Sequence, residues 1–342
     1  MSELVDHLAE LTGFRDRELL DVTLVGAFRD LLQPLSVTIF RSIGEEGQER
    51  WVTRARLAQG DLAASADPTW VDIDTLPLRT SDAARLDAFT RQAVVVVPGT
   101  PHRTLFPVDT EREALGVMEI ETHEVLAERD CRLVLSILRI YRNFQGLLDY
   151  SERDTLTGLL NRKTFDESFM KATAERAGVG LITPNDRRAE APQASHWLGV
   201  IDIDHFKRVN DNHGHLIGDE VLLLLARLMR GSFRFHDRLY RFGGEEFVVL
   251  MRSAGDEGAL NAFERMRRHV EAHAFPQVGR ITVSIGLTEI KPGDSPSGAF
   301  ERADKAVYFA KGNGRNQVCS HAALVASGKL IDETKIGAVE LF

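Results

Sequence analysis

Acidic side chains at two places in the second half of the chain have the types and spacing of metal ligands. Asp202, Ile203 and Asp204 close an apolar run that is typical of a buried strand. Glu245 and Glu246 follow two glycines that are typical of a tight turn. Oxygen ligands of this kind suit Mg²⁺, with Mn²⁺ as the alternative, and a pair of such ions activates an attacking oxygen and stabilises a leaving one. The pattern predicts nucleotidyl transfer.

Each acidic cluster also has a simpler interpretation. Acids at a strand end and in a turn are common surface features, and either one alone would be structural more often than not. In a sheet whose first strand lies beside the hairpin, however, Asp202 and Glu245 would face each other across adjacent strands. Like charges that close repel unless a cation lies between them. Gly243 and Gly244 also leave bare backbone that a ligand can approach closely, so the pairing favours a functional site.

The elements that would position these acids alternate between helix and strand. After a helix over 163–175, apolar periodicity predicts strands over 197–203, 239–242, 247–251 and 281–290, and helices over 218–231, 259–272 and 300–312. Residues 178–196 are rich in Gly, Pro, Asp and Ala and predict a surface loop. The order β-α-β-β-α-β indicates an α+β, split βαβ domain of the polymerase-palm kind. We expect an antiparallel sheet with helices on one face.

Four sequence blocks resemble the GGDEF family of diguanylate cyclases. Residues 241–247 (RFGGEEF) are similar to the family signature in its GGEEF form. The other blocks lie at 154–162 (DTLTGLLNR), 202–220 (DIDHFK to GDE) and 303–316 (ADKAVY to GRN). The resemblance covers residues 151–320 and implies a Mg²⁺-dependent enzyme that condenses two GTP into cyclic di-GMP and two pyrophosphates. We therefore predict a catalytic domain over 153–320.

The resemblance also implies catalytic roles. Asp202, the Ile203 carbonyl and Glu245 would hold the metal ions. Glu245 would also help to deprotonate the attacking 3′-hydroxyl, whose pKa metal ligation lowers. Glu246 would support the same site.

Substrate contacts follow from the same resemblance, which implies six residues: Phe206, Lys207, Asn210, Asp219, Lys311 and Arg315. Asn210 and Asp219 would read guanine, because a carboxylate accepts hydrogen bonds from an N–H pair that adenine lacks. Lys311 and Arg315 would meet the β- and γ-phosphates, and the backbone N–H groups of the first two residues would cradle phosphate. Without the resemblance, Asp219 is interpreted as an acid at a helix N-terminus and the two cations as compensation for a helix dipole.

An inhibitory product site is a further implication. Arg234 and Asp237 match the RxxD motif at the family's distance from the signature turn, and Arg265 lies where another arginine often contributes. Guanidinium groups suit phosphate and guanine edges, and the Asp237 carboxylate suits guanine N–H groups. The alternative is a local ion pair across one helical turn.

Residues 1–126 predict a separate α+β module. Residues 1–32 are interpreted as two helices, and 36–41, 50–57, 93–97 and 114–121 as strands. This order of helices, antiparallel strands and a long exit helix loosely resembles a GAF domain, which implies a sensory or regulatory module with an unknown ligand or partner. Dimerisation is an equal alternative.

A connecting helix is predicted over 127–152. Its apolar residues follow the 4-3-4-3 spacing of a heptad seam: Leu133, Ile137, Ile140, Phe144 and Leu147. A dimerising stalk and an amphipathic helix packed on its own domain are even alternatives. A homodimer is expected in either case, because two GTP-loaded half-sites must face each other. The tail over 321–342 carries no predicted role.

Composition narrows the remaining classes of protein. The 342 residues are 43% hydrophobic and 27% charged, which indicates a folded chain, and the net charge of −9 argues against binding to nucleic-acid polymers or anionic membranes. With two cysteines, no disulfide framework is expected. Residues 1–10 lack the basic flank and apolar stretch of a signal peptide, so a cytoplasmic location is expected.

Two other functions stay open. A catalytically inactive receptor would bind cyclic di-GMP at Arg234 and Asp237, although the intact set of implied catalytic and substrate residues argues against decay. A mononucleotide cyclase would share the palm chemistry and release a cyclic mononucleotide instead.

Overall fold

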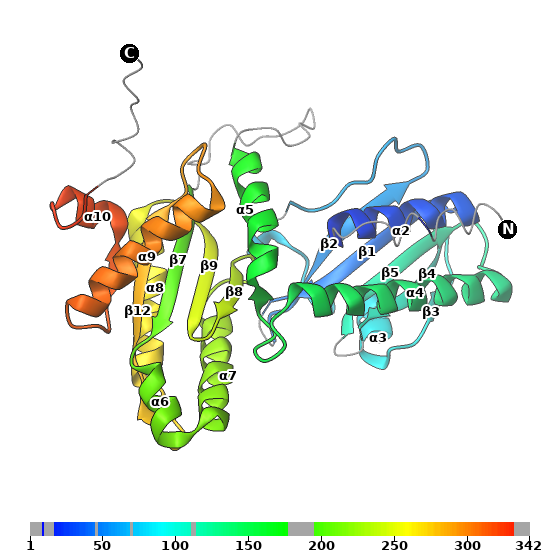
Figure 1. Cartoon of the computed structure of the whole chain (residues 1–342). Coiled ribbons are helices and arrows are strands. Elements are labelled where there is room, and N and C mark those ends of the chain that lie inside the picture. The colour runs from blue at the N-terminus through cyan, green and yellow to red at the C-terminus, as the bar shows by residue number, and fades with distance from the viewer. Residues whose placement is uncertain are drawn as a thin grey trace, which may run out of the picture. The chain divides into compact units, whose positions relative to one another are not determined.

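The computed structural model describes residue 9 and residues 17–44, 47–68, 71–110, 114–176 and 195–331. The chain divides into two compact units, residues 1–151 and 152–342. Each unit is built around one main sheet (Figure 1). Within the described ranges, no helix combines the length and apolar character that a bilayer span requires.

The first unit has a five-stranded antiparallel sheet in the order β2-β1-β5-β4-β3. Its strands are β1 (Ser36–Ile43), β2 (Arg50–Ala58), β3 (Val95–Val97), β4 (His102–Asp109) and β5 (Ala114–Thr122). The sequence analysis did not predict β4, which contains Pro107. Proline lacks a backbone N–H, and it is tolerated here because β3 pairs only with residues 103–105 of β4.

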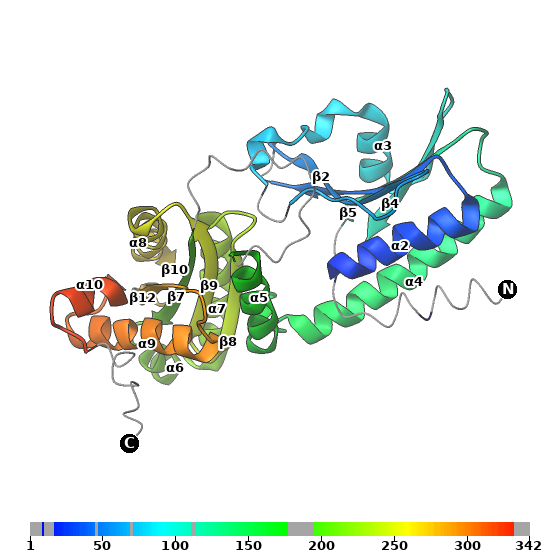
Figure 2. The same ribbon diagram turned by 90° about the horizontal axis from the view of Figure 1, so that it is seen from above.

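Helices cover both faces of this first sheet. Figure 2 shows α2 (Arg17–Leu32) and α4 (Glu128–Glu152) along one face and α3 (Ala83–Arg91) over the other. Short 3₁₀ turns at Ile73–Thr75 and Arg79–Ser81 precede α3. Helix α2 confirms the second of the two helices predicted in residues 1–32, whereas the first lies outside the described residues.

Helix α4 packs on the sheet of its own unit. Its buried apolar side chains share one core with α2 and the sheet: Val134, Ile137, Leu138, Tyr141 and Leu148. The predicted heptad seam is only partly this face. Leu133 and Phe144 pack at the edge of the core, and Leu147 is 66% exposed. The packing within the unit therefore uses the amphipathic face, and a dimerising role of the exposed seam residues stays a proposal.

The second unit has a six-stranded sheet in the order β13-β12-β7-β9-β8-β6. The four predicted strands are confirmed as β7 (Ser195–Ile203), β8 (Arg238–Gly243), β9 (Glu246–Ser253) and β12 (Val283–Glu289), which pair antiparallel. Short parallel strands at the edges, β6 (Leu160–Asn161) and β13 (Val318–Ser320), were not predicted. The central pairing of β7 with β9 places the predicted acidic clusters on neighbouring strands.

The expectation of helices on one face of this sheet is wrong. Helices α5 (Arg162–Arg176) and α9 (Pro296–Gly312) pack on one face, and α7 (His215–Ser232) and α8 (Asp256–Ala272) pack on the other. Figure 2 shows α8 and α9 on opposite sides of the strands. The physical reason lies in β7, whose residues from His196 to Ile203 are all buried, because its apolar run is continuous instead of alternating.

Smaller elements complete the second unit. Helix α6 (Phe206–His213) joins β7 to α7, the strands β10 (Ala274–Phe275) and β11 (Gly279–Arg280) form a separate hairpin, and α10 (His321–Ala326) follows β13. The predicted loop 178–196 lies outside the described residues up to 194, and residues 195 and 196 begin β7. Of the tail, residues 332–342 lie outside the described part.

Candidate active site

The pairing of β7 with β9 brings the predicted acids together. Asp202 lies directly opposite Glu246 in the register of these two strands. Glu245 occupies the turn between β8 and β9, one residue before β9 begins. The sequence analysis predicted that Asp202 faces Glu245; the structure places Glu246 across from Asp202 and Glu245 beside that pair.

The turn between β8 and β9 depends on its two glycines. Gly243 and Gly244 have φ angles of +142° and +51°, which L side chains rarely adopt. A Cβ atom built on either glycine would meet nothing within 4 Å, so the turn leaves open space over its backbone. Arg241 holds the turn closed, because its Nη2 donates to the Gly244 carbonyl oxygen at 2.9 Å.

Asp154 anchors that arginine. Arg241 Nη1 lies 3.1 Å from Asp154 Oδ1, which also accepts hydrogen bonds from the Thr157 backbone N–H and hydroxyl. Burial pushes the pKa of Asp154 upward, but the hydrogen bonds from Thr157 and Arg241 outweigh it and hold the pKa below its usual value. The sequence analysis quoted both residues inside its blocks without seeing that they pair, since 87 positions separate them.

Asp202 is the most buried acid of the cluster, with 5% of its surface exposed. Its Oδ2 lies 2.7 Å from Lys311 Nζ, whereas its Oδ1 is buried without a hydrogen-bond donor in the described part of the chain. Burial raises the pKa of Asp202, and Lys311 opposes that shift. A buried carboxylate oxygen with no partner is costly, so this atom calls for a cation or a donor.

Negative charge accumulates around Asp202. Burial and then the charge of Asp202 raise the pKa values of both Glu245 and Glu246. Asp304 of α9 adds a further negative charge near Asp202 and Glu246, and Lys311 lowers the pKa of both glutamates. Asp304 lies in the sequence block 303–316, two helical turns before Lys311, but no site role was predicted for it.

These residues fit a magnesium ion that a nucleotide completes. Among the described residues, no group of three His, Cys, Asp or Glu side chains is arranged to hold a metal ion by itself. Mg²⁺ in proteins usually takes one or two carboxylates together with waters and substrate phosphates. Asp202, with an oxygen that has no donor among the described residues, and the carboxylate of Glu245 would supply such donors, and the carbonyl of Ile203, the last residue of β7, would be a further one. The positive charge of Lys311 at Asp202 shows that the location favours a cation.

Asp204 belongs to a different arrangement from Asp202. Both of its carboxylate oxygens are occupied, because the Ser284 hydroxyl donates to Oδ1 at 2.7 Å and the Thr282 hydroxyl donates to Oδ2 at 2.7 Å. The backbone N–H of Asn316 also donates to Oδ2, at 3.0 Å. Its oxygens are thus satisfied by the protein itself.

The residues implied in guanine recognition are brought together by a close contact between α6 and α7. A Cβ atom built on Gly218 would lie 2.0 Å from Asn210 Oδ1, so glycine at this position lets the Asn210 side chain lie against α7. Asp219 follows Gly218 directly and is exposed.

The residues implied in phosphate contacts lie in two segments. Phe206 begins α6 with its side chain in the apolar core, so only its backbone is available, and Lys207 is exposed. Lys311 lies in the last turn of α9, and Arg315 is exposed after that helix. Lys311 connects the end of α9 to the acids through its ion pair with Asp202.

The predicted inhibitory residues also lie near one another. The Arg234 backbone N–H donates to Asp237 Oδ2 at 2.8 Å. Arg265 of α8 donates from Nη2 to the carbonyl oxygen of Ser232, two residues before Arg234. Burial raises the pKa of Asp237 to about 6 despite the opposing Arg234 hydrogen bond and charge.

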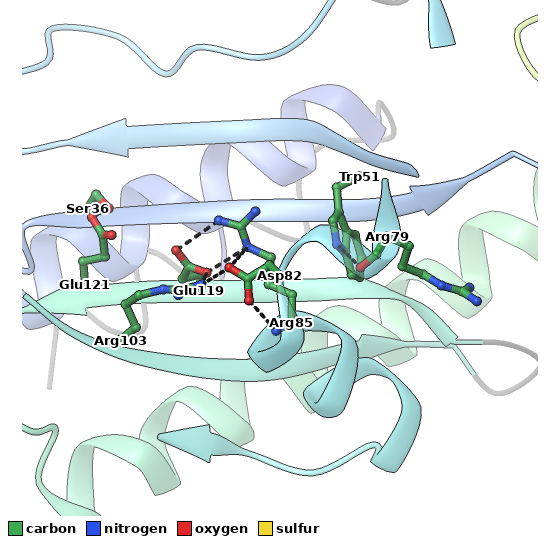
Figure 3. A network of polar contacts seen from close by, with 8 residues as sticks. All are labelled: Ser36, Trp51, Arg79, Asp82, Arg85, Arg103, Glu119 and Glu121. Carbon is green, nitrogen blue, oxygen red and sulfur yellow. Dashed lines mark hydrogen bonds and ion pairs between the residues drawn. The ribbon is translucent and has the colours of Figure 1, made fainter. Parts of the chain in front are cut away.

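A second charged cluster lies on the first unit's sheet, beneath α3. Figure 3 shows Asp82, Arg85, Arg103 and Glu119 converging there. Arg103 Nη2 lies 2.6 Å from Asp82 and 2.7 Å from Glu119, and Arg85 Nε lies 2.9 Å from Glu119. The Arg85 guanidinium also lies over the Phe40 ring, 3.7 Å from its centroid. The sequence analysis did not single out these residues.

Comparison with known proteins identifies the second unit. Residues 151–317 match the family model described as diguanylate cyclase, GGDEF domain. Diguanylate cyclase DgcP of Pseudomonas aeruginosa is 39% identical over 168 residues, which are 48% of this chain and 23% of that protein. The response regulator PleD of Caulobacter vibrioides is 33% identical over 264 residues, 72% of this chain and 54% of that protein.

One relative matches over most of its own length. Diguanylate cyclase DgcS of Shewanella oneidensis is 32% identical over 227 residues, which are 65% of this chain and 68% of that protein. The chain spans about a quarter of DgcP and about half of PleD, so the first two relatives contain long segments that it does not match.

Proposed function

This chain belongs to the GGDEF-domain family of diguanylate cyclases, and on that premise we propose that it condenses two molecules of GTP into cyclic di-GMP and two pyrophosphates. The observation that carries the proposal is the cluster of Asp202, Glu245 and Glu246 at the β7–β9 pairing. Its acids repel one another, one buried oxygen of Asp202 has no hydrogen-bond donor among the residues that the structure describes, and Lys311 lies beside them. Such a cluster is suited to a divalent cation and a triphosphate.

We infer that the side chains around this cluster orient the nucleotide. Asn210 and Asp219 would hydrogen-bond guanine, and a carboxylate acceptor left unpaired by adenine would disfavour ATP. Lys311 and Arg315 would bind the β- and γ-phosphates, together with the backbone N–H groups at Phe206 and Lys207. The position of Lys311, between Asp202 and solvent, supports this assignment.

For proton transfer we assign Glu245 as the acceptor of the 3′-hydroxyl proton. Burial and the charge of Asp202 raise the pKa of Glu245 when no cation is bound, and a cation at this site would oppose that shift. Mg²⁺ held by Asp202, Glu245 and the Ile203 carbonyl would lower the pKa of that hydroxyl and neutralise the developing phosphate charge. Glu246, opposite Asp202 in the register, would maintain the negative field that attracts the cation.

Catalysis on these terms requires two copies of the chain. Each second unit would bind one GTP, and the 3′-hydroxyl of each nucleotide would attack the α-phosphate of the other, so the two sites must face each other in a homodimer. We propose that the first unit, a GAF-like regulatory module, alters this encounter through α4. GTP is a cytoplasmic nucleotide, which supports the expected cytoplasmic location.

The test is a turnover assay of the full chain with GTP and Mg²⁺, with products separated by chromatography. We expect cyclic di-GMP, a rate per chain that falls on dilution, and loss of product in Glu245→Gln. The matched control is Glu257→Gln, which removes an exposed carboxylate at the start of α8. A cyclic mononucleotide would favour the mononucleotide cyclase, and binding of cyclic di-GMP without turnover would favour the inactive receptor.

Product inhibition at the RxxD site is a separate proposal. The short contacts that gather Arg234, Asp237 and Arg265 support it. Arg234→Ala should raise the concentration of cyclic di-GMP that halves the initial rate, because a guanidinium contact to the product is lost. An unchanged half-inhibition concentration would assign inhibition to another site.

A further inference from the structure

A chain of hydrogen bonds runs from the end of β7 to α8 and touches none of the proposed metal ligands. It begins at Asp204, which is 5% exposed and accepts from Thr282, Ser284 and the Asn316 backbone. The Asp204 backbone N–H also donates to the Thr282 carbonyl oxygen at 2.9 Å. Asp204 thus joins β7, the start of β12 and the segment after α9.

The segment after α9 has an unusual backbone. Gly314, Arg315 and Asn316 have φ angles of +107°, +61° and +44°, so two residues with side chains adopt the left-handed conformation in succession. Such a conformation is unfavourable for most L-residues and persists only where neighbouring groups hold it. The Arg315 backbone N–H donates to the Ala310 carbonyl oxygen at 2.9 Å, which closes the end of the helix.

Asn316 holds this backbone from two sides. Its N–H donates to Asp204, as described, and its side-chain Oδ1 accepts from Arg267 Nη1 at 2.7 Å. Its Nδ2 donates to Glu271 Oε1 at 2.7 Å. The carboxylate of Glu264 in turn orients Arg267 through two hydrogen bonds, at 2.8 and 3.0 Å.

We propose that Asp204, Asn316 and Arg267 are positioning residues that hold Arg315 in register with the end of β7 that carries Asp202. The inference rests on the proposed function, because it takes Arg315 as a ligand of the β- and γ-phosphates. The two acids at the end of β7 then have different roles. Asp202 faces the cation, whereas Asp204 fixes the distance between the cation site and the phosphate-binding segment. The three residues set the preference for a nucleoside triphosphate over a monophosphate.

The test compares two nucleotides on the full chain by calorimetry in the presence of Mg²⁺. One is a GTP analogue with a methylene bridge between the α- and β-phosphorus atoms, and the other is GMP, which lacks the phosphates that Arg315 would bind. The variants are Asn316→Gly and Arg267→Ala. Glycine can adopt the left-handed backbone and retains the N–H to Asp204, so that variant removes the side-chain bonds without forcing a strained φ angle.

Two reference variants frame the measurement. Arg315→Ala removes the phosphate contact itself. Arg268→Ala is the matched control, because Arg268 is the neighbouring residue of α8 and pairs with the same Glu264 on the solvent side. We expect Asn316→Gly and Arg267→Ala to lower the affinity for the triphosphate analogue about tenfold, as is typical when a residue that orients a ligand-binding side chain is lost. The affinity for GMP should stay within about twofold of the wild-type value.

The possible results distinguish failure of the positioning role from failure of the proposed function. The positioning role alone would be overturned if Asn316→Gly and Arg267→Ala weakened the binding of both nucleotides equally. It would also be overturned if both variants bound the analogue with unchanged affinity while Arg315→Ala lost that affinity. A wild-type chain that does not bind the triphosphate analogue would overturn the proposed function and this inference with it. Selective loss of analogue affinity, with Arg268→Ala unaffected, supports the inference.

Discussion

Each unit of this chain carries a cluster of charged side chains on its sheet, and the two clusters differ in how their charges are balanced. Beneath α3, Arg85 and Arg103 meet Asp82 and Glu119 (Figure 3). Burial pushes the pKa of Asp82 upward, but hydrogen bonds from the Arg85 N–H and from Arg103 outweigh it and leave the pKa low. The hydrogen bond to Glu119 raises the pKa of Arg103. Each charge is thus stabilised by its neighbours.

At the β7–β9 pairing the balance is the reverse. Burial raises the pKa of all three acids, Asp202, Glu245 and Glu246. The charge of Asp202 raises the pKa values of Glu245 and Glu246 further, and Lys311 lies 2.7 Å from Asp202. A cluster in which each charge lies beside an opposite charge stabilises the folded state of its unit. A cluster with surplus negative charge is held together by the rest of the fold and gains stability only from a ligand.

The largest expected effect comes from removing a charge at the unbalanced cluster. Asp202→Asn should lower the rate of cyclic di-GMP formation at least about 100-fold, as loss of a charge-stabilising group in an active site does. The free energy of unfolding without Mg²⁺ should stay within about 0.5 kcal/mol or rise, because the raised pKa means that the ionised carboxyl opposes folding. Assay of initial rates and urea unfolding of the same preparation check both parts. If Asp202→Asn were fully active, or if it were unfolded, the difference proposed between the two clusters would be wrong.

The balanced cluster should respond in the opposite way. Glu119→Gln leaves Arg85 and Arg103 without their shared carboxylate, whose side chain is 7% exposed, and should lower the free energy of unfolding of the first unit by about 2–3 kcal/mol. Urea titration monitored in that unit measures the loss. Asp87→Asn is the control on α3, because its ion pair with Arg91 is exposed and should be worth less than about 0.5 kcal/mol. Equal losses in both variants would show that the buried network adds nothing.

Asp237 sharpens the comparison through the pH dependence of stability. Its folded-state pKa of about 6 lies above the ordinary 3.8, so the unfolded chain releases this proton first as the pH rises. Stability from this group is therefore fully present below about pH 4 and is lost as the pH rises through about 6, by up to about 3 kcal/mol. Asp237→Asn should remove that part of the pH dependence. Parallel stability curves of wild type and variant between pH 4 and 7 would show that Asp237 is ionised as usual.

Much of the second unit could be predicted from its sequence, because local pattern is enough to locate its elements. The continuous apolar run of β7, the turn glycines at 243 and 244 and the helical periodicity of α7 and α8 each appear at the predicted place. Strand β4 was not predicted, since Pro107 argues against a strand until the short pairing of β3 is known. The helices were predicted, but their placement on both faces of the sheet was not, because the palm analogy outweighed the two-sided burial that the β7 run itself indicates.

The sequence by itself determined which chemistry is available: acids after a strand and in a glycine turn, and cations at the end of a helix. Only the tertiary structure decided how these groups divide their tasks. It sets Glu246 across from Asp202 and pairs Arg241 with Asp154. Both oxygens of Asp204 accept hydrogen bonds, whereas one oxygen of Asp202 has no donor within the described ranges. The physical reason is that periodicity records only which side chains are buried locally, whereas strand order and register decide which distant charges meet.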